Sequence, residues 1–365
     1  LVCGDAPMTL YRQKFGLAKD PFNMTPDPDL LFMTEQHREA LAGVAYAILD
    51  RKGFAVLIGP AGTGKTTLVT TVLQSLKKSP VQSSVILNPA LSPAEFLEMV
   101  LLDFGIADIP ASKAQRINIF QKFLLESHQK QKVCTVIVDE AHKLSPDVLE
   151  EIRLWTNFEF SDQKLLQIVL VGQPELRDVL NREDLRQLKQ RIALRFTIAP
   201  LSMSEVAAYI QYRWSRSGAP APAPITPEAV ALVARASAGI PRVINAICDN
   251  ALLLIFGRGL AVVSEDSARE ACRELDVLPA PHVLPGPLAM AAKPTVPMDP
   301  IPMVAHAGTN GNGAKNGVAV AQVLQAATHA PEVVNFATFR TLDSYDPAHR
   351  RSLWSRLLGK NGGGN

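Results

Sequence analysis

The feature that most constrains this chain is a glycine-rich stretch between two apolar runs. It reads Gly59-Pro60-Ala61-Gly62-Thr63-Gly64-Lys65-Thr66, follows Phe54-Ala55-Val56-Leu57-Ile58 and leads into an amphipathic run from Thr67 to Leu76. A strand, a glycine-rich turn and a helix in this order are the context that a phosphate-binding loop requires. The glycines let successive backbone N–H groups converge on one anion, and the helix adds its unpaired first-turn donors and the positive end of its dipole. The stretch therefore predicts a nucleoside triphosphate site.

Individual residues of this loop have predicted roles. Lys65 is expected to reach the β- and γ-phosphates of ATP, and the Thr66 hydroxyl is expected to ligate Mg²⁺. Contacts to the nucleotide are expected along the whole run: Gly59, Pro60, Ala61, Gly62, Thr63, Gly64, Lys65, Thr66 and Thr67. The alternative is a glycine-rich structural turn, which the strand before the loop and the helix after it disfavour.

Length and composition are typical of a soluble globular protein. With 365 residues the chain can hold two domains, and its 47% hydrophobic and 20% charged residues suit a sizeable core. The formal net charge of +2 gives no global attraction to nucleic acid or membrane, so such a partner would need a local patch. Scattered cysteines without a C-x-x-C pair disfavour a disulfide framework or zinc site and indicate buried thiols in a reducing cytosol: Cys3, Cys134, Cys248 and Cys272.

Targeting signals are absent from the sequence pattern. No apolar run approaches the roughly 20 residues that span a bilayer, and no charged-then-apolar signal opens the chain. We therefore expect a cytoplasmic protein without a transmembrane segment. Because the sequence begins with Leu1 and Met8 precedes the first organised stretch, residues 1–7 are expected to be a start-site artefact.

Changes in composition divide the chain into five predicted parts. Prolines fix an irregular N-terminal segment, residues 1–34, which would either simply wrap the neighbouring domain or wall the adenine pocket beside the phosphate loop. Residues 35–200 alternate apolar strands with helices, which predicts a three-layer α/β domain with a parallel sheet and right-handed crossovers. Residues 201–275 carry helical patterns alone and predict a small all-helical lid. Residues 276–345 are rich in proline, alanine and glycine and predict a flexible, disordered linker, which ends in a short basic tail at 346–365.

The expected elements follow from periodicity and capping signals. Two capping boxes, Ser92-Pro93-Ala94-Glu95 and Ser202-Met203-Ser204-Glu205, each mark the start of a helix, and Thr34 is the expected N-cap of another. Strands are predicted at residues 54–58, 84–87, 133–138, 165–171 and 193–198. Helices are predicted at residues 35–50, 67–76, 93–104, 114–129, 146–157, 203–217, 227–237, 241–256 and 265–274.

An acidic pair, Asp139 and Glu140, directly follows the apolar run at 133–138. Sheets of the α/β class bind ligands at the carboxyl ends of their strands. Phosphoryl transfer needs a carboxylate to hold the magnesium shell and a second group to orient or deprotonate the attacking water. Asp139 fits the first role and Glu140 the second. The alternative, a solvated acidic strand end, is disfavoured beside a phosphate loop.

Three further stretches, taken together with the loop and the acidic pair, form a specific set of motifs. They are Asp20-Pro21-Phe22-Asn23-Met24-Thr25-Pro26-Asp27-Pro28, Val171-Gly172-Gln173-Pro174-Glu175-Leu176 and Gly239-Ile240-Pro241-Arg242-Val243-Ile244-Asn245. With the Walker A loop and the Walker B Asp-Glu pair, they resemble the AAA+ ATPases, and more closely those of the general (type II) secretion pathway, the ExeA/GspA type. The resemblance covers roughly residues 9–275. It implies a homo-oligomeric enzyme that hydrolyses ATP with Mg²⁺ to assemble or remodel a protein complex of the secretion machinery or cell envelope.

The resemblance also implies roles for single residues. Gln173 lies where AAA+ proteins place a polar sensor between strand and attacking water, although asparagine or threonine is more usual there. Arg242 resembles the second sensor, which contacts the γ-phosphate from the lid. The arginine finger would be Arg191, with Arg195 and Arg186 as second choices, and a surface arginine is the alternative for each. Because a finger acts on the site of a neighbouring subunit, an isolated subunit should hydrolyse ATP slowly.

Several alternatives stay open at this stage. Secretion ATPases carry a transmembrane segment and a periplasmic region after the lid, whereas here the linker leads to a tail that could dock on a protein or an anionic membrane, or fray. A DNA-transaction ATPase, similar to transposition or origin-recognition proteins, would need a basic patch that does not stand out. A nucleotide-gated binding module would use hydrolysis only to reset a switch. Asp139-Glu140-Ala141-His142 also spells a helicase-style box, but the second domain of a helicase is not visible, so His142 is expected at a helix start or interface.

Overall fold

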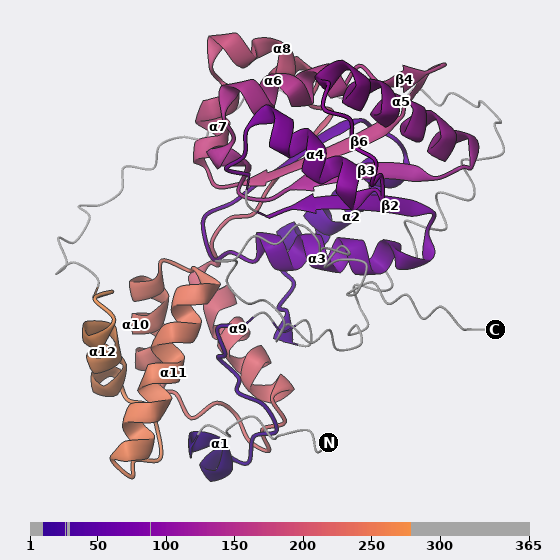
Figure 1. The fold of residues 1–365 in the computed structure, drawn as a ribbon. Coiled ribbons are helices and arrows are strands. Elements are labelled where there is room, and N and C mark those ends of the chain that lie inside the picture. The colour runs from indigo at the N-terminus through magenta and orange to yellow at the C-terminus, as the bar shows by residue number, and fades with distance from the viewer. Residues whose placement is uncertain (1–9, 26, 28–29, 88, 279–365) are drawn as a thin grey trace, which may run out of the picture.

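The fold, described by a computed structural model, combines an α/β unit with a helical unit (Figure 1). The structure describes residues 10–25, 27, 30–87 and 89–278. The predicted basic tail, nearly all of the predicted linker and Cys3 lie outside the described residues. Within the described residues, no helix combines the length and apolarity needed to cross a membrane.

A five-stranded, fully parallel sheet forms the centre of the α/β unit, with the strand order β2-β3-β6-β1-β7. Every residue of β1, β3 and β6 is buried, which explains why these strands appear in the sequence as continuous apolar runs. The predicted parallel sheet is confirmed, although β2 begins three residues earlier than expected. The strand bounds are β1 Phe54–Ile58, β2 Val81–Ile86, β3 Val133–Val138, β6 Leu166–Gly172 and β7 Leu194–Thr197.

Helices cover both faces of this sheet and complete the predicted three layers. On one face, two helices and the sheet share an apolar core that contains Leu41, Leu57 and Leu68. On the other face, five helices share a larger core that contains Phe96, Val136 and Trp155. The first pair is α2 (Glu35–Leu49) and α3 (Lys65–Ser75). The second set is α4 (Pro93–Asp103), α5 (Lys113–Gln129), α6 (Pro146–Trp155), α7 (Glu175–Leu180) and α8 (Arg186–Gln190).

The helical unit occupies the residues predicted for the lid. Its helices are α9 (Met203–Arg216), α10 (Pro227–Ser237), α11 (Pro241–Gly257) and α12 (Glu265–Glu274). Their apolar faces form one core together with Tyr11, Leu17 and Phe22 from the N-terminal segment. In this segment α1 (Leu10–Phe15) lies beside α11 (Figure 1), and the Ala18 N–H donates to the Ser217 carbonyl over 2.8 Å. The N-terminal segment therefore packs on the lid helices as well as crossing toward the α/β unit.

The capping signals act as expected. Ser92 and Ser202 each accept a hydrogen bond from the backbone N–H of the glutamate three residues on, and each glutamate carboxylate accepts one from the backbone N–H of the serine. Thr34 caps α2 by accepting from the His37 N–H over 3.3 Å. These reciprocal bonds satisfy backbone donors that the first turn of a helix leaves unpaired, so the helix starts could be read from the sequence.

Gly239 fixes the start of the helix that carries Arg242. It has a φ of +73°, and a β-carbon at this position would lie 2.0 Å from the Leu201 carbonyl oxygen. The Leu201 N–H also donates to the Gly239 carbonyl over 2.8 Å. A side chain cannot fit there, which gives a steric reason for the glycine in the Gly239-Ile240-Pro241-Arg242 stretch. The same contact ties α11 to the segment that links the α/β unit to the lid.

Several short elements were not predicted. Besides α1, α7 and α8, a two-stranded hairpin joins β4 (Glu159–Phe160) to β5 (Gln163–Lys164) just before β6. Helices of five or six residues are marginal by themselves and depend on tertiary packing, so their sequences show little periodicity. In α7 and α8, for example, the packing is supplied by buried Leu176, Leu180 and Leu188.

Candidate functional site

A pocket of about 550 Å³ lies where the phosphate loop, the lid and the N-terminal segment meet. The loop, the strand ends and the lid contribute Ala61, Gly62, Thr63, Gly64, Lys65, Thr66, Thr67, Glu140, Gln173 and Arg242. Asp139 is bonded to one of these residues, Thr66, over 2.5 Å. The structure thus brings together most of the predicted nucleotide residues. Gly59 and Pro60 begin the loop but do not line the pocket.

The backbone of the loop has the conformation that its glycines permit. Gly62 and Gly64 have φ values of +78° and +93°, and α3 begins directly after Gly64 at Lys65. The Lys65 side chain is buried and donates to the Pro60 carbonyl over 2.9 Å. Burial lowers the pKa of Lys65, while the nearby carboxylates of Asp139, Glu140 and Glu175 oppose this effect. A loop with these left-handed glycines at a helix N-terminus can present several N–H donors to phosphate oxygens.

Thr66 and Asp139 form the candidate metal side of the pocket. The Thr66 hydroxyl donates to Asp139 Oδ2 over 2.5 Å, although the two residues are 73 positions apart. Asp139 is buried, and its Oδ1 accepts from the Glu140 N–H over 2.8 Å. A hydroxyl and a carboxylate in contact supply the oxygen ligands that Mg²⁺ prefers, and Mg²⁺ commonly takes one or two such ligands together with phosphate oxygens and water. The donor set therefore fits the predicted ion.

Glu140 lies at the end of β3 in a left-handed conformation, with a φ of +53°. Its Oε2 is 3.3 Å from Gln173 Nε2, 3.2 Å from Lys143 Nζ and 3.5 Å from His142 Nε2. Burial would raise the pKa of Glu140, but the hydrogen bonds from Lys143 and Gln173 and the charges of Lys143 and His142 outweigh it and lower the pKa. The carboxylate is therefore ionised near neutral pH, as a group that activates water must be.

Gln173 and His142 flank this carboxylate. Gln173 directly follows β6, where the resemblance places a polar sensor, and its N–H donates to His142 Nδ1 over 3.4 Å. His142 lies in a single 3-10 turn (Ala141–Lys143), with its ring between Gln173 and Glu140. His142 was expected at a helix start or interface, and it lies in this short 3-10 turn. The histidine also contacts Glu140 itself, which the sequence spacing did not indicate.

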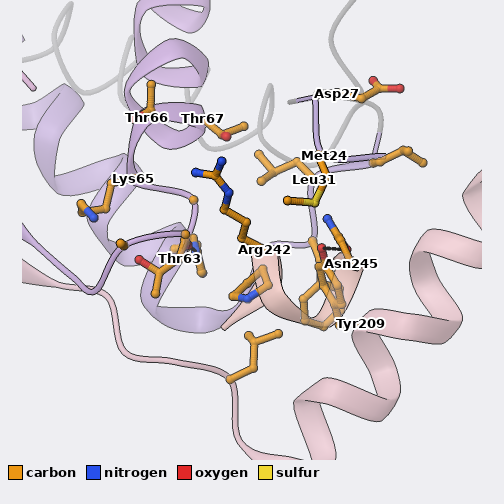
Figure 2. A pocket seen from close by; sticks show the side chains of 18 of the residues that line it. Met24, Asp27, Leu31, Thr63, Lys65, Thr66, Thr67, Tyr209, Arg242 and Asn245 are labelled. Carbon is orange, nitrogen blue, oxygen red and sulfur yellow. Dashed lines mark hydrogen bonds between the residues drawn. The ribbon is translucent and has the colours of Figure 1, made fainter. Parts of the chain in front are cut away.

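Arg242 reaches the pocket from the lid. It lies in the first turn of α11, and its backbone N–H donates to the Gly62 carbonyl over 3.4 Å. A β-carbon on Gly62 would come within 2.8 Å of the Arg242 Cβ, so the phosphate loop and the lid touch at this point. Figure 2 shows the Arg242 side chain extending into the pocket between the phosphate loop and the N-terminal segment. From there its guanidinium could contact the phosphates of a bound nucleotide.

A buried polar network forms the opposite wall of the pocket. Arg213 donates to the backbone carbonyls of Pro21 over 2.5 Å and Asn23 over 3.4 Å, and to the Tyr209 hydroxyl over 3.2 Å. Tyr209 in turn donates to Asn245 Oδ1 over 2.8 Å (Figure 2). No motif in the sequence singles out these side chains, although a wall of the adenine pocket was one of the two roles expected for the N-terminal segment. Residues of that segment line the pocket here: Asn23, Met24, Thr25, Asp27, Leu30, Leu31 and Phe32.

Removing the Arg213 guanidinium is expected to weaken nucleotide binding through the base side of the pocket. Arg213→Ala loses the bonds to Pro21 and Asn23, which help to tie this wall to α9. At about 1 kcal/mol for each hydrogen bond, we expect the Kd for ATP to rise about tenfold or more. Titration with ATP and with inorganic tripolyphosphate should separate the two ends of the pocket, because only ATP affinity should fall. Arg216→Ala, an exposed arginine on the same helix, is the matched control; an equal loss for both ligands would contradict this assignment.

The three candidate finger arginines lie away from this pocket. Arg186, Arg191 and Arg195 are exposed, and none of them lines it. Arg191 is the C-cap residue that follows α8, and Arg195 donates to the Lys189 carbonyl over 3.3 Å. A finger that serves a neighbouring subunit has to face outward, so this exposure suits the role without choosing among the three arginines. The assignment of Arg191 stays a prediction.

Comparison with known proteins places this arrangement in a family. Residues 48–180 match the family described as AAA domain. Over 251 residues, 68% of this chain, the sequence is 43% identical to general secretion pathway protein A of Aeromonas hydrophila. Residues 48–180 are thus an AAA domain, and over 68% of its length the chain is similar to the AAA ATPases of the general secretion pathway protein A type. This AAA protein spans 46% of the length of that relative, and AAA proteins of this class bind nucleotide, typically with Mg²⁺.

More distant similarities extend beyond secretion proteins. The AAA protein is 27% identical over 69% of its length to the ATP-dependent target DNA activator B of Escherichia phage Mu, of which it covers 75%. Among solved structures, the Drosophila ORC bound to DNA matches with a TM-score of 0.58 at 20% identity, covering 76% of this chain and 68% of that chain. Cdc6p from Pyrobaculum aerophilum matches with a TM-score of 0.55 at 16% identity, covering 72% of each chain. At these identities the structures establish the fold alone.

Proposed function

We propose that this AAA protein binds Mg²⁺-ATP in the pocket between the α/β unit and the lid and hydrolyses it to ADP and phosphate. The observation that carries the proposal is the Thr66–Asp139 contact beside the Glu140–Gln173 contact. Thr66 and Asp139 would hold Mg²⁺, which offsets the negative charge that develops on the phosphates. Glu140 would take the proton of the attacking water while Gln173 orients it.

The lid would link hydrolysis to movement. Because Arg242 lies on α11 and its side chain lines the pocket, a γ-phosphate that binds this arginine would draw the lid toward the phosphate loop. Loss of that phosphate would release the contact. Residues 10–22 pack on the lid, so the N-terminal segment would move with it and carry the base-side wall of the pocket.

Completion of the site by a neighbouring subunit is part of the proposal. If Arg191 acts in trans, phosphate release per subunit should rise with protein concentration, and Arg191→Ala should lower it by about 10³–10⁵-fold without weakening ATP binding. Mixing Arg191→Ala with Lys65→Ala should restore partial activity, since the first variant keeps an intact pocket and the second an intact finger. Arg182→Ala, another exposed arginine, is the control. Activity of Arg191→Ala equal to wild type at all concentrations would refute this arginine as the finger.

The work done with ATP is proposed to be the assembly or remodelling of a protein complex in secretion or the cell envelope, carried out from the cytoplasm. Support comes from the name and the 43% identity of the Aeromonas relative. The test is an affinity pull-down with Glu140→Gln held in its ATP state, with Lys65→Ala as the nucleotide-free control. Recovery of inner-membrane secretion components by the first variant alone would support the assignment. Recovery of DNA-recombination proteins instead would overturn it.

A second candidate is a DNA-transaction ATPase, favoured by the similarity to the phage Mu DNA activator. Such a protein should be retained on DNA in the presence of ATP, and its affinity should fall steeply with salt because basic side chains displace counterions from phosphates. Retention that is weak and independent of ATP would count against it. A third candidate, a nucleotide-gated binding module, predicts that Glu140→Gln leaves the function of the complex intact.

A further inference from the structure

A buried histidine outside the predicted site contacts the backbone of the phosphate loop. His37 lies in the first turn of α2, is 4% exposed and lines the pocket. Its Nε2 is 3.0 Å from the Thr63 carbonyl oxygen, and its Nδ1 is 2.6 Å from Thr34 Oγ1. The ring therefore bridges the end of the N-terminal segment and the middle of the loop.

The chemistry of the two partners fixes the tautomer of His37. A carbonyl oxygen can only accept, so Nε2 carries the hydrogen and donates to Thr63. Nδ1 is then the acceptor and takes the hydroxyl hydrogen of Thr34, while the Thr34 oxygen accepts from the His37 backbone N–H over 3.3 Å. Burial lowers the pKa of His37, against the raising effects of the Thr63 bond and the Glu205 charge, and so favours this neutral form. Every polar atom of the ring has a partner.

The Thr63 carbonyl is part of the peptide that precedes Gly64. In a trans peptide the carbonyl and the following N–H point in opposite directions, so the orientation of the Thr63 oxygen sets that of the Gly64 N–H. Gly64 has a φ of +93°, a conformation that glycine adopts about as readily as one with negative φ. The glycine itself therefore does little to hold the preceding peptide in one orientation. In a loop of this kind, the fixed direction of the N–H groups determines how many of them meet a phosphate.

We propose that His37 is a positioning residue of the phosphate loop: by holding the Thr63 carbonyl, it keeps the Gly64 N–H directed at the phosphates. The inference rests on the proposed nucleotide site. It adds that the start of α2, through its N-cap Thr34 and through His37, sets the affinity of the phosphate loop for nucleotide, although Thr63 lies 26 positions from His37. His37 would act on binding and leave the chemical step to Glu140.

Three substitutions separate positioning from a structural role. His37→Leu removes the donor, His37→Gln places an amide nitrogen at about the same distance from the backbone as Nε2, and His37→Asn places it one bond short. Kd values for ATP and ADP, kcat, and the Tm of the nucleotide-free protein are measured for each variant. We expect His37→Leu and His37→Asn to raise both Kd values about tenfold, the equivalent of about 1.4 kcal/mol, with kcat at saturating ATP unchanged. His37→Gln should recover most of the affinity.

The outcomes are distinguishable. Wild-type affinity for ATP in His37→Leu would overturn the role of His37 and leave the proposed nucleotide site intact. The same conclusion would follow if His37→Gln and His37→Asn lost ATP affinity equally and in parallel with a fall in their Tm. Failure of the wild-type protein itself to bind ATP would overturn the proposed function and this inference with it. If His37→Leu does not fold, the comparison of the glutamine and asparagine variants decides the question, since both carry the same amide donor at different distances from the backbone and the Tm of each reports the effect of the one methylene by which they differ in size.

Discussion

Lys65→Ala is expected to abolish nucleotide binding, raising the Kd for ATP by at least a hundredfold. The lysine is buried at the N-terminus of α3, in the loop that faces the pocket. Hydrogen bonds to charged groups contribute about 1.5–3 kcal/mol each, and the ammonium group is expected to make two of them, one to each of the terminal phosphates. Isothermal titration with Mg²⁺-ATP gives the affinity directly, and the Tm of each protein without nucleotide shows whether the fold is retained.

Lys77→Ala provides the matched control for this prediction. Lys77 is exposed just after α3, so its removal changes the net charge equally without touching the loop. It should bind ATP with wild-type affinity. If Lys65→Ala also bound with wild-type affinity, the assignment of the phosphate loop would be wrong, and with it the roles derived for Thr66 and Asp139.

Glu140→Gln is expected to lower the rate of hydrolysis by about 10²–10⁴-fold while ATP affinity is retained. The amide keeps the shape of the side chain but cannot take a proton from water. The Glu140 carboxylate also forms an ion pair with Lys143 and accepts a hydrogen bond from Gln173, so the substitution removes the charged partner of both residues. After incubation with ATP, the nucleotide that co-purifies with the variant should be ATP, whereas wild type should yield ADP.

The control for this variant is Glu126→Gln, at an exposed position on α5. It should hydrolyse ATP at the wild-type rate. If ADP were recovered from Glu140→Gln as fast as from wild type, Glu140 would not be the base, and a solvated carboxylate at the strand end would describe it better.

The sheet and the lid could be predicted because their signals are local. Strands buried on both faces form apolar runs, as β3 and β6 do, and the Ser92 and Ser202 capping boxes mark the starts of α4 and α9. The start of β2 was missed because its first three residues are only half-buried and include Gln82 and Ser83. The sheet order could not be predicted, since it depends on which apolar runs pair across long separations.

The phosphate side of the site was also readable from the sequence. A loop after β1 and an acidic pair after β3 must meet at the same edge of a parallel sheet, which is why Thr66 and Asp139 come into contact. The base side was readable only in part: the N-terminal segment was one candidate for a pocket wall, but the contact that holds it could not be predicted. Arg213 donates to Pro21, 192 residues away, and neither residue belongs to a motif whose spacing indicates the contact.

His37 illustrates the same limit on a smaller scale. Flanked by the exposed polar residues Glu35, Gln36, Arg38 and Glu39, a histidine reads as an ordinary polar residue of the first turn. Its function depends on the Thr63 carbonyl, a backbone atom that has no sequence signature. The local sequence offers only a capping threonine followed three residues later by a histidine, and this pattern is not specific by itself.

ATP hydrolysis by this chain is tested most directly by measuring phosphate release from ATP by the purified chain, at several protein concentrations, with Mg²⁺ and with EDTA. We expect phosphate release that requires Mg²⁺, rises per subunit with protein concentration, and is lost in Lys65→Ala and Glu140→Gln. Phosphate release by Glu140→Gln at the wild-type rate, or no Mg²⁺-dependent release by wild type at any concentration, would contradict the proposed hydrolysis.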